Sequence, residues 1–381
     1  MNEDARTSLA ELARLFLRLG ATAFGGPAAH IAMMQDEVVK RRRWLTDQRF
    51  LDLLGATNLI PGPNSTEMAI HIGWQRRRWS GLLVAGVCFI VPAMLITAAA
   101  GWAYVRFGAR VEAQSVLYGI KPVVLAVVVQ AILGLAPKAA KTTTCKVIGS
   151  AVAVAAAFGT NELLLLIGAG LAALFAARKS ALLPNTLSPA VPALVPAAAA
   201  AAGAPTLPGL FWVFFKTGSV LYGSGYVLLA FLRTALVEQR HWLTDAQLID
   251  AVAVGQVTPG PVFTTATFIG YVLGGPHGAW VATLGIFAPA FIFVAASGPL
   301  IPRLRASSSA GAFLDGVNVA SLALMAVVTV QLAAAALVDL PTCLLAVASA
   351  VALVRWRLNS VWLVLAGALA GWLLHAAGFA H

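Results

Sequence analysis

The chain has 381 residues, of which 60% are hydrophobic and only 11% are charged, and its mean hydropathy is +0.84. So much apolar surface exceeds what the core of one soluble domain buries, which argues against a soluble enzyme or binding module. The formal net charge of +11 would suit a nucleic-acid partner, but Lys and Arg lie mostly in short segments between apolar runs, as membrane insertion favours. We therefore expect an all-α polytopic membrane protein, embedded in the lipid bilayer, that binds no nucleic acid.

The first half of the chain predicts broken helices followed by membrane spans. An apolar segment carrying Arg18 is interrupted at Phe24-Gly25-Gly26-Pro27. Residues 50–73 are interrupted at Pro61-Gly62-Pro63, where proline removes backbone donors and disfavours helix in the preceding residue. We interpret them as a re-entrant helical hairpin. Spans of about 20 residues are then expected at 80–103 and 115–136, with two shorter ones in 147–177.

The second half repeats the first at an offset of 198 residues. Trp-Leu-Thr-Asp at 44–47 recurs at 242–245, and Pro61-Gly62-Pro63 recurs as Pro259-Gly260-Pro261. The offset later becomes 197, and further spans are expected at 278–300, 313–338 and 359–378. The predicted units are therefore residues 1–179 and 209–381, joined by an uncharged connector rich in Ala and Pro at 180–208.

Loop charges predict that the two halves are inverted relative to each other. Arg and Lys are concentrated on both sides of the first hairpin, at residues 40–49 and 76–78, and so favour a cytoplasmic location. The flanks of the second hairpin are balanced or uncharged and favour the outside. About five crossings per half, in addition to the hairpin, place the first hairpin inside and the second outside, because an odd number of crossings inverts the second copy. Both termini are then external.

The residues after each Pro-Gly-Pro break are candidates for anion binding. A backbone that leaves the helix inside a membrane must face protein or a watery cavity, and a helix N-terminus attracts anions. A proline kink with only a structural role is the alternative. The candidate ligands are Asn64, Ser65 and Thr66 in the first half and Thr264 and Thr265 in the second. Asn58 and Gln256, three residues before the breaks, either orient the substrate or cap the freed backbone.

Two matched cations, Arg18 and Lys216, lie in the first apolar segment of each half. Buried cations are costly, so the pair suggests neutralisation of a dianion without a fixed counter-ion. Snorkelling to the interface is the alternative. The matched glycines permit either close backbone approach to a ligand or tight helix packing; they are Gly25, Gly26, Gly223 and Gly225.

Three titratable residues occur in the first half only. Glu67 and His71 are four residues apart on one helical face, and His30 follows the Gly-Gly-Pro break. They are candidates for coupling transport to protons, with simple hydration as the alternative. Each Trp-Leu-Thr-Asp phrase predicts a helix N-cap. The three cysteines are isolated and no nucleotide-binding, hydrolase or metalloprotease motif occurs, so we expect no enzyme, no cofactor and no metal site.

These motifs together resemble the chromate ion transporter family, across both halves from about residue 12 to residue 336. The resemblance implies a bacterial long-chain member with two fused homologous domains in the inner (plasma) membrane. It implies export of chromate, driven by protons or the membrane potential, and chromate resistance. The second copy departs from the pattern, with Gly223-Ser224-Gly225 for Gly-Gly-Pro and no counterpart of His30.

The residues themselves favour only a small tetrahedral oxyanion, so sulfate suits the same ligands as chromate. A transporter or channel for sulfate or another small anion stays open at this point, as does a homodimer. A membrane-embedded enzyme that reduces chromate would need a redox group, for which the sequence offers no motif.

Overall fold

The computed structural model describes residues 7–24, 26–182, 203–222, 227–297, 308–356, 358 and 360–377. Within these residues every regular element is helical, which confirms the predicted all-α class. The first half contains α1 (Leu9–Thr22), α2 (Gly26–Gln35), the π-helix η1 (Asp36–Arg41), α3 (Asp47–Thr57), α4 (Asn64–Phe107), α5 (Val111–Ala139), α6 (Thr143–Ala157) and α7 (Glu162–Leu182).

The second half repeats this order of elements, which supports the duplication read from the sequence. It contains α8 (Leu207–Val220), α9 (Leu228–Leu232), the π-helix η3 (Arg233–Glu238), α10 (Asp245–Val257), the 3-10 helix η4 (Val262–Thr264), α11 (Thr265–Ser297), α13 (Ser308–Ala336), α14 (Leu340–Arg355) and α15 (Ser360–Ala376). Thus α1, α3, α4, α5, α6 and α7 correspond to α8, α10, α11, α13, α14 and α15.

The Trp-Leu-Thr-Asp phrases begin helices as predicted. Thr46 is the N-cap of α3, and its side chain accepts a hydrogen bond from the backbone N–H of Arg49 at 3.2 Å. Thr244 caps α10 in the same way and forms a capping box with Gln247. Such caps satisfy backbone donors that the first helical turn leaves unpaired, so a local sequence signal fixes where each hairpin starts.

A second turn, here called the return turn, follows each Pro-Gly-Pro break inside the next long helix, and the two return turns have nearly the same backbone conformation. Inside α4, Arg77 (φ −146, ψ 24) and Arg78 (φ 51, ψ −132) leave the helical region. Inside α11, Gly274 (φ −146, ψ 20) and Gly275 (φ 60, ψ −153) do the same. Each long helix is therefore a short arm, a sharp turn and a long arm. This similarity of dihedral angles arises although one turn is built from arginine and the other from glycine.

Four described helices are long and apolar enough to cross a membrane: Asn64–Phe107, Val111–Ala139, Val262–Ser297 and Ser309–Ala336. Four further apolar helices, α6, α7, α14 and α15, have shorter apolar stretches. Large apolar side chains such as Trp79, Leu83 and Leu95 remain exposed along α4, as expected of a surface that faces lipid. The protein is a multi-pass membrane protein, and five spans per half and their inverted orientation stay predictions.

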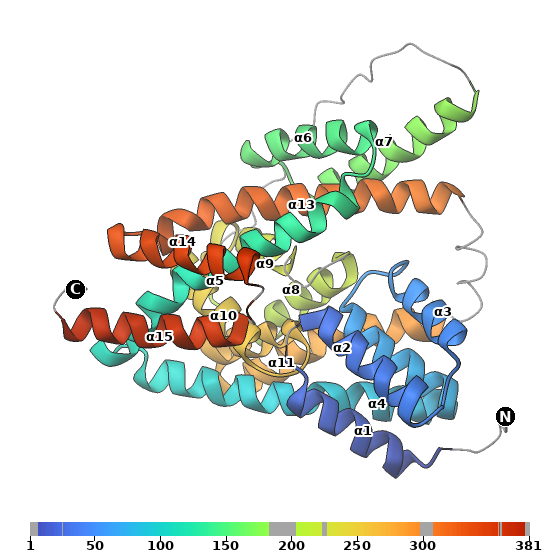
Figure 1. Ribbon diagram of the computed structural model, residues 1–381, viewed down its shortest axis with the longest axis horizontal. Helices are drawn as coiled ribbons and strands as arrows, with labels where there is room; N and C mark the ends of the chain where they lie inside the picture. Colours follow the sequence, from blue (N-terminus) through green and yellow to red (C-terminus); the bar gives the residue numbers. More distant parts are fainter. Residues whose placement is uncertain are drawn as a thin grey trace.

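The two halves interlock through their last helices. In Figure 1, α6 and α7 lie along α13, while α14 and α15 flank α5, and these pairs are in contact. Glycines allow the close approach, since Gly119 of α5 faces the backbone of Gly367 and Gly371 in α15. The last two helices of the first half thus pack on α13, and those of the second half pack on α5, which makes the halves one structural unit.

Candidate functional site

Each Pro-Gly-Pro break is hydrogen-bonded to the opposite half of the chain. The N–H of Gly62 donates to the carbonyl of Leu221 at 2.8 Å, and the N–H of Gly260 donates to the carbonyl of Ala23 at 2.9 Å. Leu221 and Ala23 are the corresponding C-cap residues of α8 and α1. Two symmetric bonds therefore join the breaks to the ends of the first helices, at the contact between the halves.

The conformation of both breaks requires glycine. Gly62 has φ 140 and Gly260 has φ 84, values that residues with a side chain rarely adopt. A Cβ atom on Gly260 would lie 2.7 Å from Cβ of Ala93 in α4, and one on Gly62 would lie 3.9 Å from Cβ of Ala290 in α11. The two breaks thus contact equivalent alanines of opposite halves. Of the flanking prolines, Pro63 and Pro261 have extended backbones before the helices that follow.

The helix starts that follow the breaks differ in their free hydroxyl groups. Ser65 and Thr66 are buried in the first turn of α4, and Oγ1 of Thr66 has no hydrogen-bond partner among the described residues. In the second half the hydroxyl of Thr264 donates to the carbonyl of Pro261 at 2.9 Å, and that of Thr265 donates to Val262 at 2.8 Å. Only the first helix start offers a hydroxyl that is not already engaged by the backbone.

The amides before the breaks also have different environments. Asn58 is exposed at the C-cap of α3, and its Oδ1 accepts a hydrogen bond from Nδ2 of Asn64 at 3.0 Å. Gln256 is buried, and its Nε2 has no partner within the described part of the chain. The Asn58 side chain is therefore engaged by Asn64, whereas Gln256 leaves an unused donor beside the second break.

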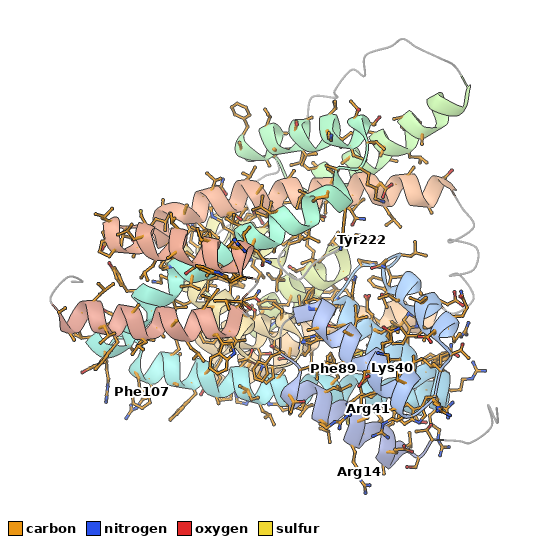
Figure 2. The ribbon with its side chains drawn as sticks, in the orientation of Figure 1. Arg14, Lys40, Arg41, Phe89, Phe107 and Tyr222 are labelled. Atoms are coloured by element: carbon orange, nitrogen blue, oxygen red, sulfur yellow. The ribbon has the colours of Figure 1, made fainter. Side chains whose placement is uncertain are left out.

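The three titratable candidates are all buried. His30 Nε2 lies 3.0 Å from the carbonyl of Ala23, the same oxygen that accepts from Gly260, while its Nδ1 is unpartnered among the described groups. Its ring packs edge-on against Phe89, which is labelled in Figure 2. His71 likewise has a buried Nε2 with no described partner.

Glu67 is the most isolated of these groups. It is 0% exposed, and neither carboxylate oxygen has a hydrogen-bond partner among the described residues. Its Oε1 lies against the face of Gly62 where a side chain would otherwise project. A buried carboxylate with no donor is costly to ionise. The structure therefore brings Thr66, Glu67 and Gly62 together at the first break.

The two predicted cations have different surroundings. Arg18 is half-exposed and lies 2.5 Å from the carboxylate of Glu37, which differs from the expected cation without a fixed counter-ion. Burial alone would raise the pKa of Glu37, but hydrogen bonds from Arg18 and Arg42 and the charge of Arg41 hold that pKa below its usual value. Lys216 instead lines a cavity of about 440 Å³ together with Glu162 and Arg240.

The glycines of the other predicted breaks are only partly described. Gly26 begins α2 with φ 74, so its place requires a residue without a side chain. Gly25, Gly223 and Gly225 lie outside the described residues. Their predicted part in binding stays a prediction.

A charged cluster between the halves, around the buried Asp250, was not predicted from the sequence. Asp250 of α10 accepts a hydrogen bond from the Tyr104 hydroxyl at 2.9 Å, and its other oxygen lies 3.6 Å from Nζ of Lys121. In the sequence, Asp250 follows the predicted N-cap phrase at 242–245 and shows no separate signal. Lys121, a lone cation inside a long apolar run, was the signal that would have revealed the cluster.

Comparison with known proteins identifies the family to which this arrangement belongs. A family model described as "Chromate transporter" matches residues 10–174 and 209–372, one segment in each half. The chain belongs to the chromate transporter family. This confirms the resemblance read from the paired Pro-Gly-Pro motifs, and it points to a membrane transport protein.

Individual relatives agree with the family model. A chromate transport protein from Cupriavidus metallidurans is 34% identical over 77% of this chain and 74% of its own length. A probable chromate transport protein from Synechococcus elongatus is 31% identical, covering 77% of this chain and 76% of the relative. One from Pseudomonas aeruginosa is 33% identical, covering 75% and 72%. No solved structure matches this chain.

Proposed function

We propose that this member of the family is a secondary transporter that exports chromate across the bacterial plasma membrane and so confers chromate resistance. Three relatives named as chromate or probable chromate transport proteins support chromate as the cargo. The proposed binding site lies between the two Pro-Gly-Pro breaks. Transport then follows from relative movement of the two halves around that site.

One observation carries the proposal: buried donors without partners gather at breaks that join the two halves. Thr66 follows the first break and Gln256 precedes the second. Neither Thr66 Oγ1 nor Gln256 Nε2 has a hydrogen-bond partner among the described residues. Gly62 and Gly260 bond to the opposite half. A tetrahedral oxyanion accepts hydrogen bonds in several directions, so hydroxyl, amide and helix N-terminal donors suit it. Asn64 and Ser65 are further candidate ligands at the start of α4.

Proton coupling is assigned to the first half in this proposal. An ionised Glu67 would repel a dianion, so Glu67 carries a proton while the anion is bound. A dianion leaving with one proton moves a net charge of minus one outward, which an inside-negative membrane potential favours. His30 and His71, also buried and incompletely paired, are the proposed groups through which the proton moves.

The cations Arg18 and Lys216 are proposed to attract the anion on its way to the site. Lys216 lines the cavity along α8, whose last residues precede the Leu221 carbonyl bound by Gly62. Arg18 can serve the anion only by exchanging its present partner, Glu37. We therefore propose that Lys216 contributes more than Arg18 to attracting the anion.

Chromate uptake into inside-out membrane vesicles tests the function, with sulfate as competitor. Saturable uptake above that of empty vesicles, increased by an interior-positive potential, is the expected result. No uptake above the empty vesicles would exclude chromate transport. Equal uptake of sulfate would make the protein a general oxyanion transporter. A steady, non-saturating anion current under voltage alone would identify a channel.

A further inference from the structure

A cavity of about 440 Å³ lies beside Lys216, between the two halves of the chain. Its walls come from α8, α9 and η3 of the second half and from the start of α7 in the first half. Three of its lining residues carry a charge: Lys216, Arg240 and Glu162. The others include the aromatic rings of Trp212, Phe215 and Phe231. The cavity therefore combines two cations, one carboxylate and an apolar wall.

The backbone fixes which residues of the first half correspond to this cavity. The N–H of Trp44 donates to the carbonyl of Val38 at 2.7 Å, and that of Trp242 donates to the carbonyl of Leu236 at 2.8 Å. The two donors and the two acceptors are each 198 residues apart, which is the offset found in the sequence. The residues Arg18, Glu37, Arg41 and Arg42 therefore correspond to Lys216, Ala235, Gln239 and Arg240.

In the first half a carboxylate fills the matched place. Glu37 is 7% exposed. Its carboxylate oxygens lie 2.5 Å from Arg18, 3.2 Å from Arg41 and 3.3 Å from Arg42. Charge-assisted hydrogen bonds of this kind are among the strongest in proteins. The arrangement is that of an anion-binding site whose anion belongs to the chain itself.

In the second half the carboxylate is missing while the donors remain. Ala235 takes the place of Glu37. Lys216 and Arg240 keep two of the three positive charges, and Gln239 keeps a hydrogen-bond donor at the third place. All four residues of the second half line the cavity. The cavity thus has the donors of an anion site but no carboxylate at the position that Glu37 occupies in the first half.

Glu162 limits the charge that the cavity accepts. This residue begins α7 and is 8% exposed. Its carboxylate accepts a hydrogen bond from the Thr234 hydroxyl and interacts with the charge of Lys216. One of the two positive charges is thereby balanced from within the chain, so a ligand with a single negative charge balances the other. The aromatic wall suits an apolar group attached to that anion.

We propose that this cavity binds a monoanionic oxyanion group, such as a phosphodiester, between Lys216 and Arg240. The oxygens of that group accept from the two cations and from the amide of Gln239, as a carboxylate accepts from three arginines in the first half. This second site goes beyond the proposed function, in which Lys216 only attracts the transported anion. A free anion from water and the phosphate of a membrane phospholipid share this chemistry, so a soluble phosphodiester and a phospholipid serve as separate probes.

Protection of Lys216 from acetylation tests the site. Purified, detergent-washed protein reacts with N-hydroxysuccinimide acetate, a neutral lysine reagent, and peptide mass spectrometry gives the rate at each lysine. Dimethyl phosphate should slow the reaction at Lys216 by about tenfold at saturation, since a bound anion keeps the amine protonated and covered. Phosphatidylglycerol is the lipid probe, with zwitterionic phosphatidylcholine as its control. Lys138, an exposed lysine outside the cavity, should react at an unchanged rate in the same sample.

The two probes identify the source of the anion. Protection by dimethyl phosphate assigns the site to a free oxyanion, and protection by phosphatidylglycerol alone assigns it to a lipid headgroup. Either result supports the cavity as an anion site. If neither probe slows Lys216 more than Lys138, the proposal is wrong. Equal protection by the two lipids without protection by dimethyl phosphate also contradicts it, because the apolar wall alone would then hold the lipid.

Ala235→Glu supplies the missing carboxylate and so locates the site. It should slow acetylation of Lys216 without any added anion, and neither probe should slow the reaction further. Ala235→Gln, with a neutral side chain of the same size, is the matched control and should leave Lys216 as reactive as in the unaltered protein. A further tenfold slowing by either probe in Ala235→Glu would place the anion elsewhere and contradict the proposal.

The unaltered protein keeps the test decisive if Ala235→Glu folds poorly. The comparison of Lys216 with Lys138 then decides by itself. Acetylation is measured without chromate, so a lack of chromate uptake would refute the proposed function and leave this result standing.

Discussion

The two hairpins share a backbone but differ in chemistry. Their breaks bond to opposite halves through Gly62 and Gly260, and their return turns have nearly the same dihedral angles. Yet the first hairpin carries Glu67 and His71 where the second carries Thr265 and Ile269. Duplication has preserved the positions at which two helices must approach closely. It has left the polar side chains free to differ: among the described residues the first copy holds the unpaired groups of Thr66, Glu67 and His71, whereas the second holds the unpaired amide of Gln256.

The largest expected effect concerns a close glycine–glycine contact that both hairpins share. Gly73 faces the backbone of Gly81, and Gly270 faces Gly278 in the same way. Gly73→Leu and Gly270→Leu should each destabilise the protein by ~3 kcal/mol, because a side chain would force the two arms apart. Much less folded protein in the membrane is the expected measurement. Gly134→Leu, at an exposed glycine with nothing within 4 Å, is the control.

If only one of the two glycine variants lowered the amount of folded protein, the two hairpins would not be equivalent in packing. Equal damage in both halves is required if the hairpins are equivalent in packing. Normal amounts of both variants would show that the close crossing of the arms does not hold the hairpins together.

The next largest effect concerns Glu67, for which the second hairpin has no carboxylate counterpart. Chromate uptake should increase as pH falls, by roughly tenfold per unit at most, if one proton must bind to Glu67 with the anion. Glu67→Gln should transport at a rate that no longer depends on pH in that range, since the neutral amide needs no proton. Initial uptake rates between pH 6 and pH 8 measure this. Thr265→Val, at the equivalent place, should keep the original pH dependence.

The other titratable groups near the first break provide an internal check. If Glu67→Gln retains the full pH dependence while His71→Gln or His30→Gln removes it, the proton is carried by histidine. The proposed role of Glu67 would then be wrong.

A smaller effect is expected from the two matched threonines. Thr66→Val should weaken chromate binding by about tenfold or more, because a hydrogen bond to a charged ligand contributes roughly 1.5–3 kcal/mol. Thr264→Val should change binding little, since its hydroxyl already donates to Pro261. The concentration for half-maximal uptake measures both. Equal losses in the two variants would mean that both helix starts contact the anion.

The smallest expected effect lies at the return turns. Arg78 has φ 51 and ψ −132, a conformation that the matched Gly275 adopts at little cost. Arg78→Gly should stabilise the protein by about 1 kcal/mol, less the loss of the contact between Arg78 and the Trp74 ring. Gly275→Ala should destabilise it by a similar amount. Thermal unfolding in detergent measures both, and a lower Tm for Arg78→Gly would contradict the strain.

Local sequence signals determined much of this protein. The all-helical membrane character, the repeat, the breaks and the N-caps at Thr46 and Thr244 follow from composition, spacing and the backbone chemistry of proline and threonine. These features depend on residues close in sequence, and the repeat compares the chain with itself. The family could be recognised for the same reason, because its motifs are contiguous.

Only the tertiary structure decided which distant groups meet. The bonds from Gly62 to Leu221 and from Gly260 to Ala23, the pairing of Arg18 with Glu37, and the cluster around Asp250 join segments that no periodicity relates. Matched residues predicted symmetric roles, but Arg18 and Lys216 have different neighbours, and so do Asp52 and Asp250. The physical reason is packing: α10 contacts helices of both halves, whereas among the described elements α3 packs mainly on α4, so equivalent sequence positions reach different surroundings.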